Sequence, residues 1–211
     1  MTPLTQNYEH LAATVIKGLE KRQMEGYYCP DSASAVAKAL ELMPQGSSIA
    51  WGGSMTLAQV GLMEAIRAGG YEIIDRDLAK TPDEKRQMYA RIVGADFFLM
   101  STNAITQRGE LINIDGAGNR VGPLCHGPRN VIVVAGMNKI VPDVESGIAR
   151  VHLQAAPPNC VRLARKTPCA AAGVCGDCHS PDTICCHTVV TRHVFQKGRV
   201  KVILVGQELG F

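Results

Sequence analysis

Apolar residues along the chain alternate between helical spacing and unbroken runs. From residue 8 to about residue 24 they recur every fourth position, which predicts an amphipathic helix that ends before Gly26. Asp31 stands at the expected N-cap of a second helix, which extends to Pro44. A further helix is predicted over residues 57–67. Two more are expected to begin at the capping-box pair Thr81 and Glu84 and at Pro142.

Unbroken apolar runs separate these helices and predict strands that are buried on both faces. The clearest run is residues 130–135, and residues 95–100 repeat the pattern. Helices that alternate with buried strands are typical of a parallel sheet covered on both sides. The predicted fold class is therefore α/β, an open and mostly parallel sheet with helices on both faces. Shorter strands are expected at residues 47–51, 71–74, 111–114 and 200–205.

Composition and charge exclude several classes of protein. The 211 residues are 46% hydrophobic and 19% charged, which excludes a disordered or fibrous chain. The net charge is +3 and the basic residues are scattered without an aromatic platform, so no nucleic-acid partner is expected. No apolar stretch approaches the roughly 20 residues that cross a bilayer, and residues 1–10 lack the features of a secretory signal. We therefore expect a cytoplasmic protein with no membrane partner.

The eight cysteines are distributed unevenly. Because cytoplasmic proteins rarely keep structural disulfides, clustered thiols in such a chain indicate metal or redox chemistry. Cys29, Cys125 and Cys160 stand apart from the others, and the simplest interpretation makes them small buried hydrophobic residues. The remaining five lie within one short segment and are Cys169, Cys175, Cys178, Cys185 and Cys186.

A C-x-x-C pair lies inside this cysteine-rich segment. The spacing of Cys175 and Cys178 is found in zinc and iron–sulfur sites alike. A structural zinc site more often joins two such pairs, whereas here a single pair is flanked by further cysteines, which suits an iron–sulfur cluster at least as well. Alternatives are a c-type haem motif ending in His179, a thioredoxin-like redox pair, and free thiols without a metal. His179 or His187 could also replace a cysteine ligand.

A glycine-rich turn follows the strand predicted at residues 47–51. Gly52 and Gly53 permit close backbone approach, and Ser54 and Thr56 add hydroxyl groups at the start of a helix, so this turn could hold a phosphate or a carboxylate. The sequence matches neither the Walker nor the dinucleotide-binding pattern, so ATP or NAD binding is not supported. The alternative is an ordinary strand–helix turn in which Ser54 or Thr56 only caps the helix.

The alternation of helices and strands breaks between residues 102 and 121, in a stretch rich in glycine, amides and acids. If this loop folds over the carboxyl edge of the sheet, one carboxylate could act as a general base while amides orient a substrate. The alternative is that the acids are solvated and that the Asp-Gly and Asn positions make turns. The candidates are Asn103, Glu110, Asn113 and Asp115, together with Asn138 and Lys139 after residues 130–135.

Four segments carry a family resemblance: residues 52–57 (GGSMTL), 94–120, 136–143 (GMNKIVPD) and 208–211 (ELGF). They resemble the LUD domain, a family of lactate-utilisation proteins. The resemblance implies a fold similar to the NagB/RpiA/CoA-transferase superfamily, which binds small phosphorylated or acyl metabolites. In such relatives the Gly-Ser turn tends to hold the anion and the acidic loop supplies carboxylates. Some family members work beside iron–sulfur and flavin subunits in oxidising L-lactate, although this sequence contains no recognisable flavin site.

The resemblance strengthens the assignment of site residues. Carried over position by position, it implies roles for Gly53, Ser54, Thr56, Asn103, Glu110, Asn113, Asp115 and Lys139. We predict catalytic roles for Glu110, Asp115 and Lys139, and substrate binding by Gly52, Gly53, Ser54, Thr56, Asn103, Asn113 and Asn138. A subgroup of the family is similar in its cysteine-rich tail, so the predicted metal ligands are Cys169, Cys175, Cys178 and Cys185, with Cys186 as a spare.

These inferences give a prediction for the whole chain. The chain is expected to comprise an α/β LUD domain with N-terminal helices (1–160), a cysteine-rich cluster-binding segment (161–190), and final strands that return to the sheet (191–211). The leading hypothesis is a protein of organic-acid (lactate-type) utilisation that holds a [4Fe–4S] cluster and binds a small anionic metabolite. The alternatives are a sugar-phosphate isomerase or acyl/CoA-transferase-like enzyme with structural zinc, and a non-catalytic metabolite-binding or regulatory module. Electron-transfer proteins and a second copy of the chain, forming a homodimer, are further candidate partners.

Overall fold

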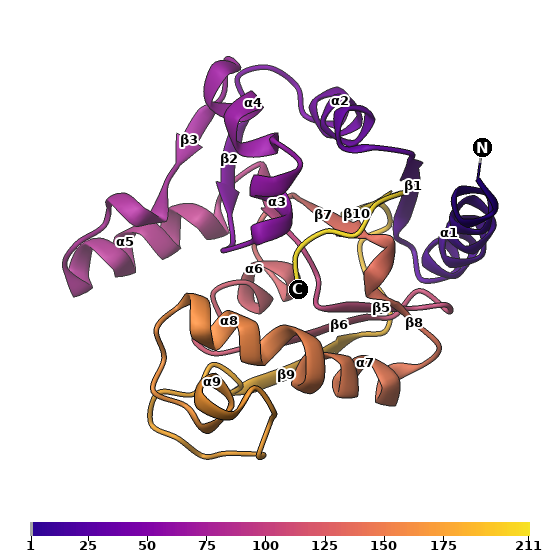
Figure 1. Cartoon of the computed structure of the whole chain (residues 1–211). Helices are drawn as coiled ribbons and strands as arrows, with labels where there is room; N and C mark the ends of the chain where they lie inside the picture. The colour runs from indigo at the N-terminus through magenta and orange to yellow at the C-terminus, as the bar shows by residue number, and fades with distance from the viewer. Residues whose placement is uncertain (1) are drawn as a thin grey trace.

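The computed structural model describes residues 2–211, in which helices pack against two β-sheets (Figure 1). The larger sheet has six strands in the order β1-β10-β7-β4-β2-β3, and every neighbouring pair is parallel. The prediction of an α/β fold with a mostly parallel sheet is confirmed. The strands of this sheet are β1 (Glu25–Cys29), β2 (Ser48–Trp51), β3 (Glu72–Ile74), β4 (Phe97–Met100), β7 (Asn130–Gly136) and β10 (Val200–Val205).

Alternate residues of the central strands face two different cores. Phe98 and Met100 of β4 contact one apolar cluster, whereas Phe97 and Leu99 contact the other. Helices α1, α5 and α6 cover the first face of the sheet, and α2, α3 and α4 cover the second. Burial on both sides explains the unbroken apolar runs. The helices are α1 (Pro3–Lys21), α2 (Ser32–Leu42), α3 (Met55–Gln59), α4 (Leu62–Ala68), α5 (Pro82–Val93) and α6 (Val121–Cys125).

Two helix starts that were predicted from capping residues are confirmed. The Asp31 carboxylate accepts a hydrogen bond from the Ser34 N–H at 2.8 Å, at the start of α2. At the start of α5 the Thr81 hydroxyl accepts from the Glu84 N–H at 3.2 Å, and the Glu84 carboxylate accepts from the Thr81 N–H at 3.0 Å. These contacts satisfy backbone donors that the first helical turn leaves unpaired.

Two segments differ from the predicted elements. Residues 25–29 form β1, which pairs with β10 along its whole length, so a distant strand supplies the hydrogen bonds that the local sequence does not indicate. Residues 57–67 form two helices rather than one, because Gly61 between α3 and α4 has a φ of +81°. A residue in the left-handed region cannot continue a right-handed helix.

The smaller sheet has the strand order β8-β5-β6-β9. Of its strands, the sequence pattern predicts only the one at residues 111–114. β9 pairs antiparallel with β6 and places His187 opposite Asp115. The chain therefore returns to the end of β6 directly after its cysteine-rich segment. The strands are β5 (Ala104–Thr106), β6 (Leu111–Asp115), β8 (Ile140–Val141) and β9 (His187–Thr191).

A helical segment connects β8 to the cysteines, and in Figure 1 it lies in orange along the smaller sheet, on the side away from α2 and α4. It contains one π-helical turn, η3, which directly precedes α8, and the first turn of α8 contains Pro157 and Pro158. Prolines are tolerated there because the first helical N–H groups have no partner within the helix. The elements are α7 (Val144–Arg150), η3 (Val151–Ala155), α8 (Ala156–Arg162) and α9 (Pro168–Ala172), with two 3₁₀ turns elsewhere, η1 (Arg76–Leu78) and η2 (Met137–Lys139).

None of the helices formed by residues 2–211 combines the length and the apolar character needed to span a bilayer.

Candidate functional site

A cavity of about 520 Å³ lies at the carboxyl ends of β2, β4 and β7. The turn after β2 contributes residues 53–56, the segment after β4 contributes residues 101–103, and Lys139 follows β7. Asp115, the last residue of β6, also lines this cavity. Loops at the carboxyl edge of a parallel sheet meet at one place, which is where α/β proteins bind their ligands. We refer to this space as the cationic cavity, because several arginines and a lysine line it.

The two glycines of the turn after β2 make room for arginine side chains. A Cβ atom at Gly52 would lie 2.7 Å from Cγ of Arg120, and one at Gly53 would lie 2.9 Å from a terminal nitrogen of Arg76. Gly53 lines the cavity, whereas Gly52 lies behind it against the aliphatic part of Arg120. The predicted close approach at this turn is therefore an approach of the chain's own arginine side chains.

Ser54 and Thr56 have different hydrogen-bonding roles in this turn. The Ser54 hydroxyl accepts a hydrogen bond from the Leu57 N–H at 3.2 Å, so it caps the short helix α3. Thr56 is buried, and its hydroxyl accepts a hydrogen bond from Lys139 Nζ at 3.1 Å. Thr56 therefore connects the turn after β2 to the turn after β7.

Lys139 brings a buried amine into the cavity. The residue is 4% exposed, and its Nζ lies 3.1 Å from the Thr56 hydroxyl and 3.0 Å from the Ser101 hydroxyl. Burial, reinforced by the positive charges of Arg150 and Arg120, lowers the pKa of Lys139 from 10.5 to about 7. Near neutral pH a large fraction of this amine is therefore uncharged.

The pKa of Lys139 leads to a prediction about pH. Because the ammonium attracts an anion and the neutral amine does not, the affinity for a small dicarboxylate such as oxalate should fall about tenfold as the pH rises through about 7. In contrast, the free energy of unfolding should rise with pH between about 7 and 10.5, because the unfolded chain binds the extra proton in that window. Calorimetric titration at several pH values checks the first trend, and urea unfolding checks the second.

Lys139→Met provides the control for both measurements. It should bind oxalate weakly at every pH and should lose the rise in stability above neutral pH. Equal oxalate affinity of the wild-type protein on both sides of pH 7 would contradict the prediction.

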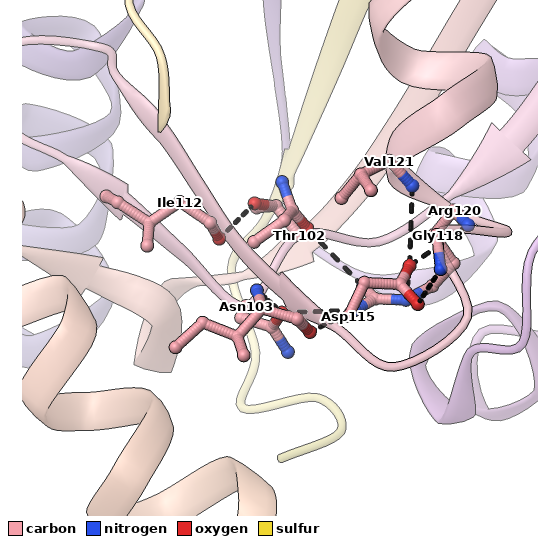
Figure 2. A network of polar contacts seen from close by, with 9 residues as sticks. Thr102, Asn103, Ile112, Asp115, Gly118, Arg120 and Val121 are labelled. Carbon is pink, nitrogen blue, oxygen red and sulfur yellow. Dashed lines mark hydrogen bonds and ion pairs between the residues drawn. The ribbon is translucent and has the colours of Figure 1, made fainter. Parts of the chain in front are cut away.

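Asp115 organises the loop that follows β6 (Figure 2). Its side chain is 4% exposed, and its carboxylate accepts hydrogen bonds from the backbone N–H groups of Gly118 (3.1 Å), Arg120 (3.0 Å) and Val121 (3.3 Å). Nε of Arg120 lies 3.4 Å from the same carboxylate. These contacts hold residues 116–121 in place at the rim of the cationic cavity.

The Arg120 side chain connects this loop to two neighbouring segments (Figure 2). Its guanidinium donates to the Ile114 carbonyl at 2.7 Å and to Asn103 Oδ1 at 3.3 Å. Asn103 Oδ1 also accepts from the Ile114 N–H at 3.0 Å. Burial lowers the pKa of the Arg120 guanidinium, and the nearby Asp115 carboxylate opposes this shift. Asn103, Asp115 and Arg120 therefore form one network on a wall of the cavity.

Glu110 lies outside the cationic cavity. It forms an ion pair with Arg22 at the end of α1 and accepts a hydrogen bond from the Thr106 hydroxyl. β6 connects Glu110 to Asp115, five positions further along the chain, which corresponds to about 16 Å in an extended strand. The expectation that both acids serve one loop site does not match this geometry, because a strand and not a loop connects them.

Two of the predicted amides also lie outside the cavity. Asn113 is fully buried, its Oδ1 lies 3.4 Å from a guanidinium nitrogen of Arg120, and its Nδ2 has no partner among residues 2–211. Asn138 Oδ1 accepts a hydrogen bond from the Leu209 N–H at 3.1 Å, which holds the last residues of the chain against the sheet. Asn138 therefore holds residue 209 beside the cavity, and neither amide lines it.

Three further arginines line the cationic cavity, and the sequence pattern did not predict them. Arg76 follows β3, Arg162 ends α8, and Arg165 lies just beyond it. Arg165 forms an ion pair with Asp182 at 2.8 Å. Arg76 lies just after the strand predicted at residues 71–74, and this position could have identified it as a site residue. Arg162 and Arg165 reach the cavity only because α8 packs beside it.

A second cavity, of about 330 Å³, is surrounded by thiol groups. We refer to it as the thiol cavity. The Thr167 hydroxyl lies 3.3 Å from Sγ of Cys169, and Nδ1 of His152, in the π-helical turn, lies 3.1 Å from Sγ of Cys175. Among residues 2–211, no three His, Cys, Asp or Glu side chains converge on one point as the ligands of a single ion would. The cysteines that line the cavity are Cys160, Cys169, Cys175, Cys178, Cys185 and Cys186.

The two cavities are adjacent. Ala156, Thr183, Cys185 and Cys186 line both of them. Burial, followed by the charges of the neighbouring thiols, raises the pKa of Cys185 to about 11. A bound cation would reverse this shift by stabilising thiolates. The lining of the thiol cavity therefore supplies the residue type that soft metals prefer, next to the cationic cavity.

The three cysteines that stand apart in the sequence have different environments. Cys29 is buried, as predicted. Cys125 is exposed at the end of the short helix α6, so its predicted burial is wrong. Cys160 is buried as predicted, but it also lines the thiol cavity, because α8 carries it to the cysteine-rich segment. Its position nine residues before Cys169 was the only sequence signal for this contact.

Comparisons with known proteins agree with this architecture. Among solved structures, a DUF162 family protein from Deinococcus radiodurans is similar in fold, with a TM-score of 0.55, 14% sequence identity, and coverage of 94% of this chain and 98% of that chain. No curated protein sequence matches this chain significantly. A family profile described as the LUD domain matches residues 12–205. Because this match includes nearly the whole chain, the protein belongs to the LUD domain family.

Proposed function

We propose that this LUD domain protein takes part in lactate-type organic-acid utilisation, binding a small organic anion in the cationic cavity beside an iron–sulfur cluster in the thiol cavity. The observation that carries the proposal is the contact between the two cavities, which share Cys185 and Cys186. An anion in the first cavity would lie next to a metal group held by the second. The proposed cluster ligands are Cys169, Cys175, Cys178 and Cys185.

The charges around the first cavity support the binding of an anion. Its two lining acidic side chains, Asp115 and Asp182, are each paired with an arginine. Lys139, Arg76 and Arg162 add positive charge that these acids do not neutralise. A concave site lined mainly by one sign of charge concentrates ligands of the opposite sign. The Gly-Ser turn contributes by giving Arg76 and Arg120 the space to reach the cavity.

The thiol groups support the second half of the proposal. Iron–sulfur clusters are held by cysteine thiolates, and when bound such a cluster supplies one-electron transfer. The chain's own contribution would be to bring the sulfur atoms to the cluster. His152 positions Cys175, Thr167 positions Cys169, and the pairing of β9 with β6 returns the end of the segment to the cavity.

Iron analysis tests the cluster directly. Protein purified without oxygen should be brown and contain about four irons per chain, the content of one [4Fe–4S] cluster. Cys175→Ser and Cys178→Ser should each lose most of the iron and the visible absorbance, because each variant removes one thiolate ligand. Elemental analysis and the visible spectrum measure both quantities.

Cys186→Ser and Cys160→Ser are the matched controls, because both residues line the same cavity but lie outside the proposed ligand set. Both variants should keep the iron. A colourless wild-type protein with stoichiometric zinc would contradict the cluster, and loss of iron from a control variant would contradict the ligand assignment. The binding of oxalate described above tests the anion site separately.

A further inference from the structure

In the part of the chain that the structure describes, two hydroxyl oxygens, and no carboxylate, lie next to the Lys139 amine. An uncharged NH₂ group has two donors and one lone pair, and two hydroxyl oxygens, of Thr56 and Ser101, lie within hydrogen-bonding distance of Nζ. Among residues 2–211, no carboxylate forms an ion pair with Lys139. These two contacts leave one position of the nitrogen without a polar partner among residues 2–211, and the residue lines the cationic cavity.

The surroundings of this amine keep it reactive near neutral pH. Burial and the charges of Arg150 and Arg120 lower its pKa to about 7, so the nucleophilic form is well populated. A buried lysine among cationic groups is a known means of activating an amine for attack on a carbonyl. The same cations attract the negative charge of a ligand that approaches the amine.

We propose that Lys139 forms an imine with the carbonyl carbon of a 2-oxo acid bound in the cationic cavity. This inference rests on the anion site of the proposed function and names its ligand class more closely. A 2-oxo acid places a carboxylate beside a carbonyl group, which matches guanidinium groups beside a buried amine. It is also the two-electron oxidation product of a 2-hydroxy acid of the lactate type.

The reaction is balanced without any oxidant or reductant. The lone pair of Nζ attacks the carbonyl carbon, an N–C bond forms, and the carbonyl π electrons move to oxygen, which takes up a proton. The nitrogen then releases its protons as the C–O bond breaks and water leaves, which gives the imine. The hydroxyl groups of Thr56 and Ser101 lie within hydrogen-bonding distance of Nζ, where they can accept the protons that the nitrogen releases.

Reductive trapping tests the inference. Wild-type protein is incubated with pyruvate and sodium cyanoborohydride, which reduces an imine to a stable secondary amine, and the modified peptide is identified by mass spectrometry. We expect about one adduct per chain, on Lys139, with a yield that saturates with pyruvate and falls when oxalate competes. Lys139→Gln should prevent this adduct.

Lys201 provides an internal control in the same digest. It is also largely buried, but its Nζ lies 3.7 Å from the Glu25 carboxylate and outside the cationic cavity, so it should stay unmodified. Modification spread over surface lysines without saturation, or an unmodified Lys139 in the wild-type protein, would overturn the inference. If Lys139 is unmodified but oxalate binds normally, only the imine is contradicted and the anion site is still supported. If oxalate does not bind, both proposals are contradicted.

Discussion

Replacement of Asp115 by alanine is expected to lower the free energy of unfolding by about 3–5 kcal/mol, the cost of removing one partner from a buried ion pair. The substitution leaves the Arg120 guanidinium buried without its carboxylate, and three backbone N–H groups lose their acceptor. At about 2–4 °C per kcal/mol for a chain of this size, the melting temperature should fall by about 10 °C. Thermal and urea unfolding measure the effect.

Asp182→Ala is the matched control. Asp182 lines the same cavity and forms an ion pair with Arg165 at 2.8 Å, but both side chains are at least one-third exposed. Exposed pairs contribute about 0–1 kcal/mol, so this variant should unfold nearly like the wild type. Equal destabilisation by the two substitutions would show that the Asp115 network does not stabilise the fold.

Replacement of Phe98 by alanine should cost about 3–5 kcal/mol, the range for an aromatic side chain truncated in a core. Phe98 is fully buried in β4, at the centre of the larger sheet, and contacts the cluster beneath α1, α5 and α6. The loss combines the transfer of apolar surface with the cavity that remains. Urea unfolding should give a lower midpoint with a similar slope.

Phe195→Ala removes the same side chain from the surface. Phe195 is 97% exposed, so its replacement should change the stability by no more than about 0.5 kcal/mol. A large loss of stability in Phe195→Ala would indicate a contact that the structure of the single chain does not contain. A small loss of stability in Phe98→Ala would mean that the core around β4 readily repacks.

The sequence predicted those elements of the fold whose signals are local. Capping residues such as Asp31 and Thr81 fix helix starts through contacts within three or four positions, and the runs at residues 95–100 and 130–135 are long enough to identify buried strands. β1 was missed because its pairing with β10 depends on residues far away in the chain. The smaller sheet was mostly missed because two of its strands have only two or three residues, too few for a pattern.

The candidate site was predictable where strand ends could be located. The turn after β2 and Lys139 after β7 were placed at one edge because parallel strands bring their carboxyl ends together. Glu110 and Asp115 were grouped because they are close in sequence, but β6 extends between them. Arg162 and Cys160 reach the cavities through the packing of α8, and short-range spacing contains no information about such packing.

The position of β10 has a consequence for the synthesis of the protein. Residues 200–205 insert between β1 and β7, pairing residue 201 with residue 25 and residue 200 with residue 131. Until these residues leave the ribosome, the nascent chain has two open strand edges and an incomplete hydrophobic core. Open edges favour aggregation, and contacts across such long loops form slowly. We therefore expect the chain to be prone to aggregation until β10 has paired with both of its neighbours.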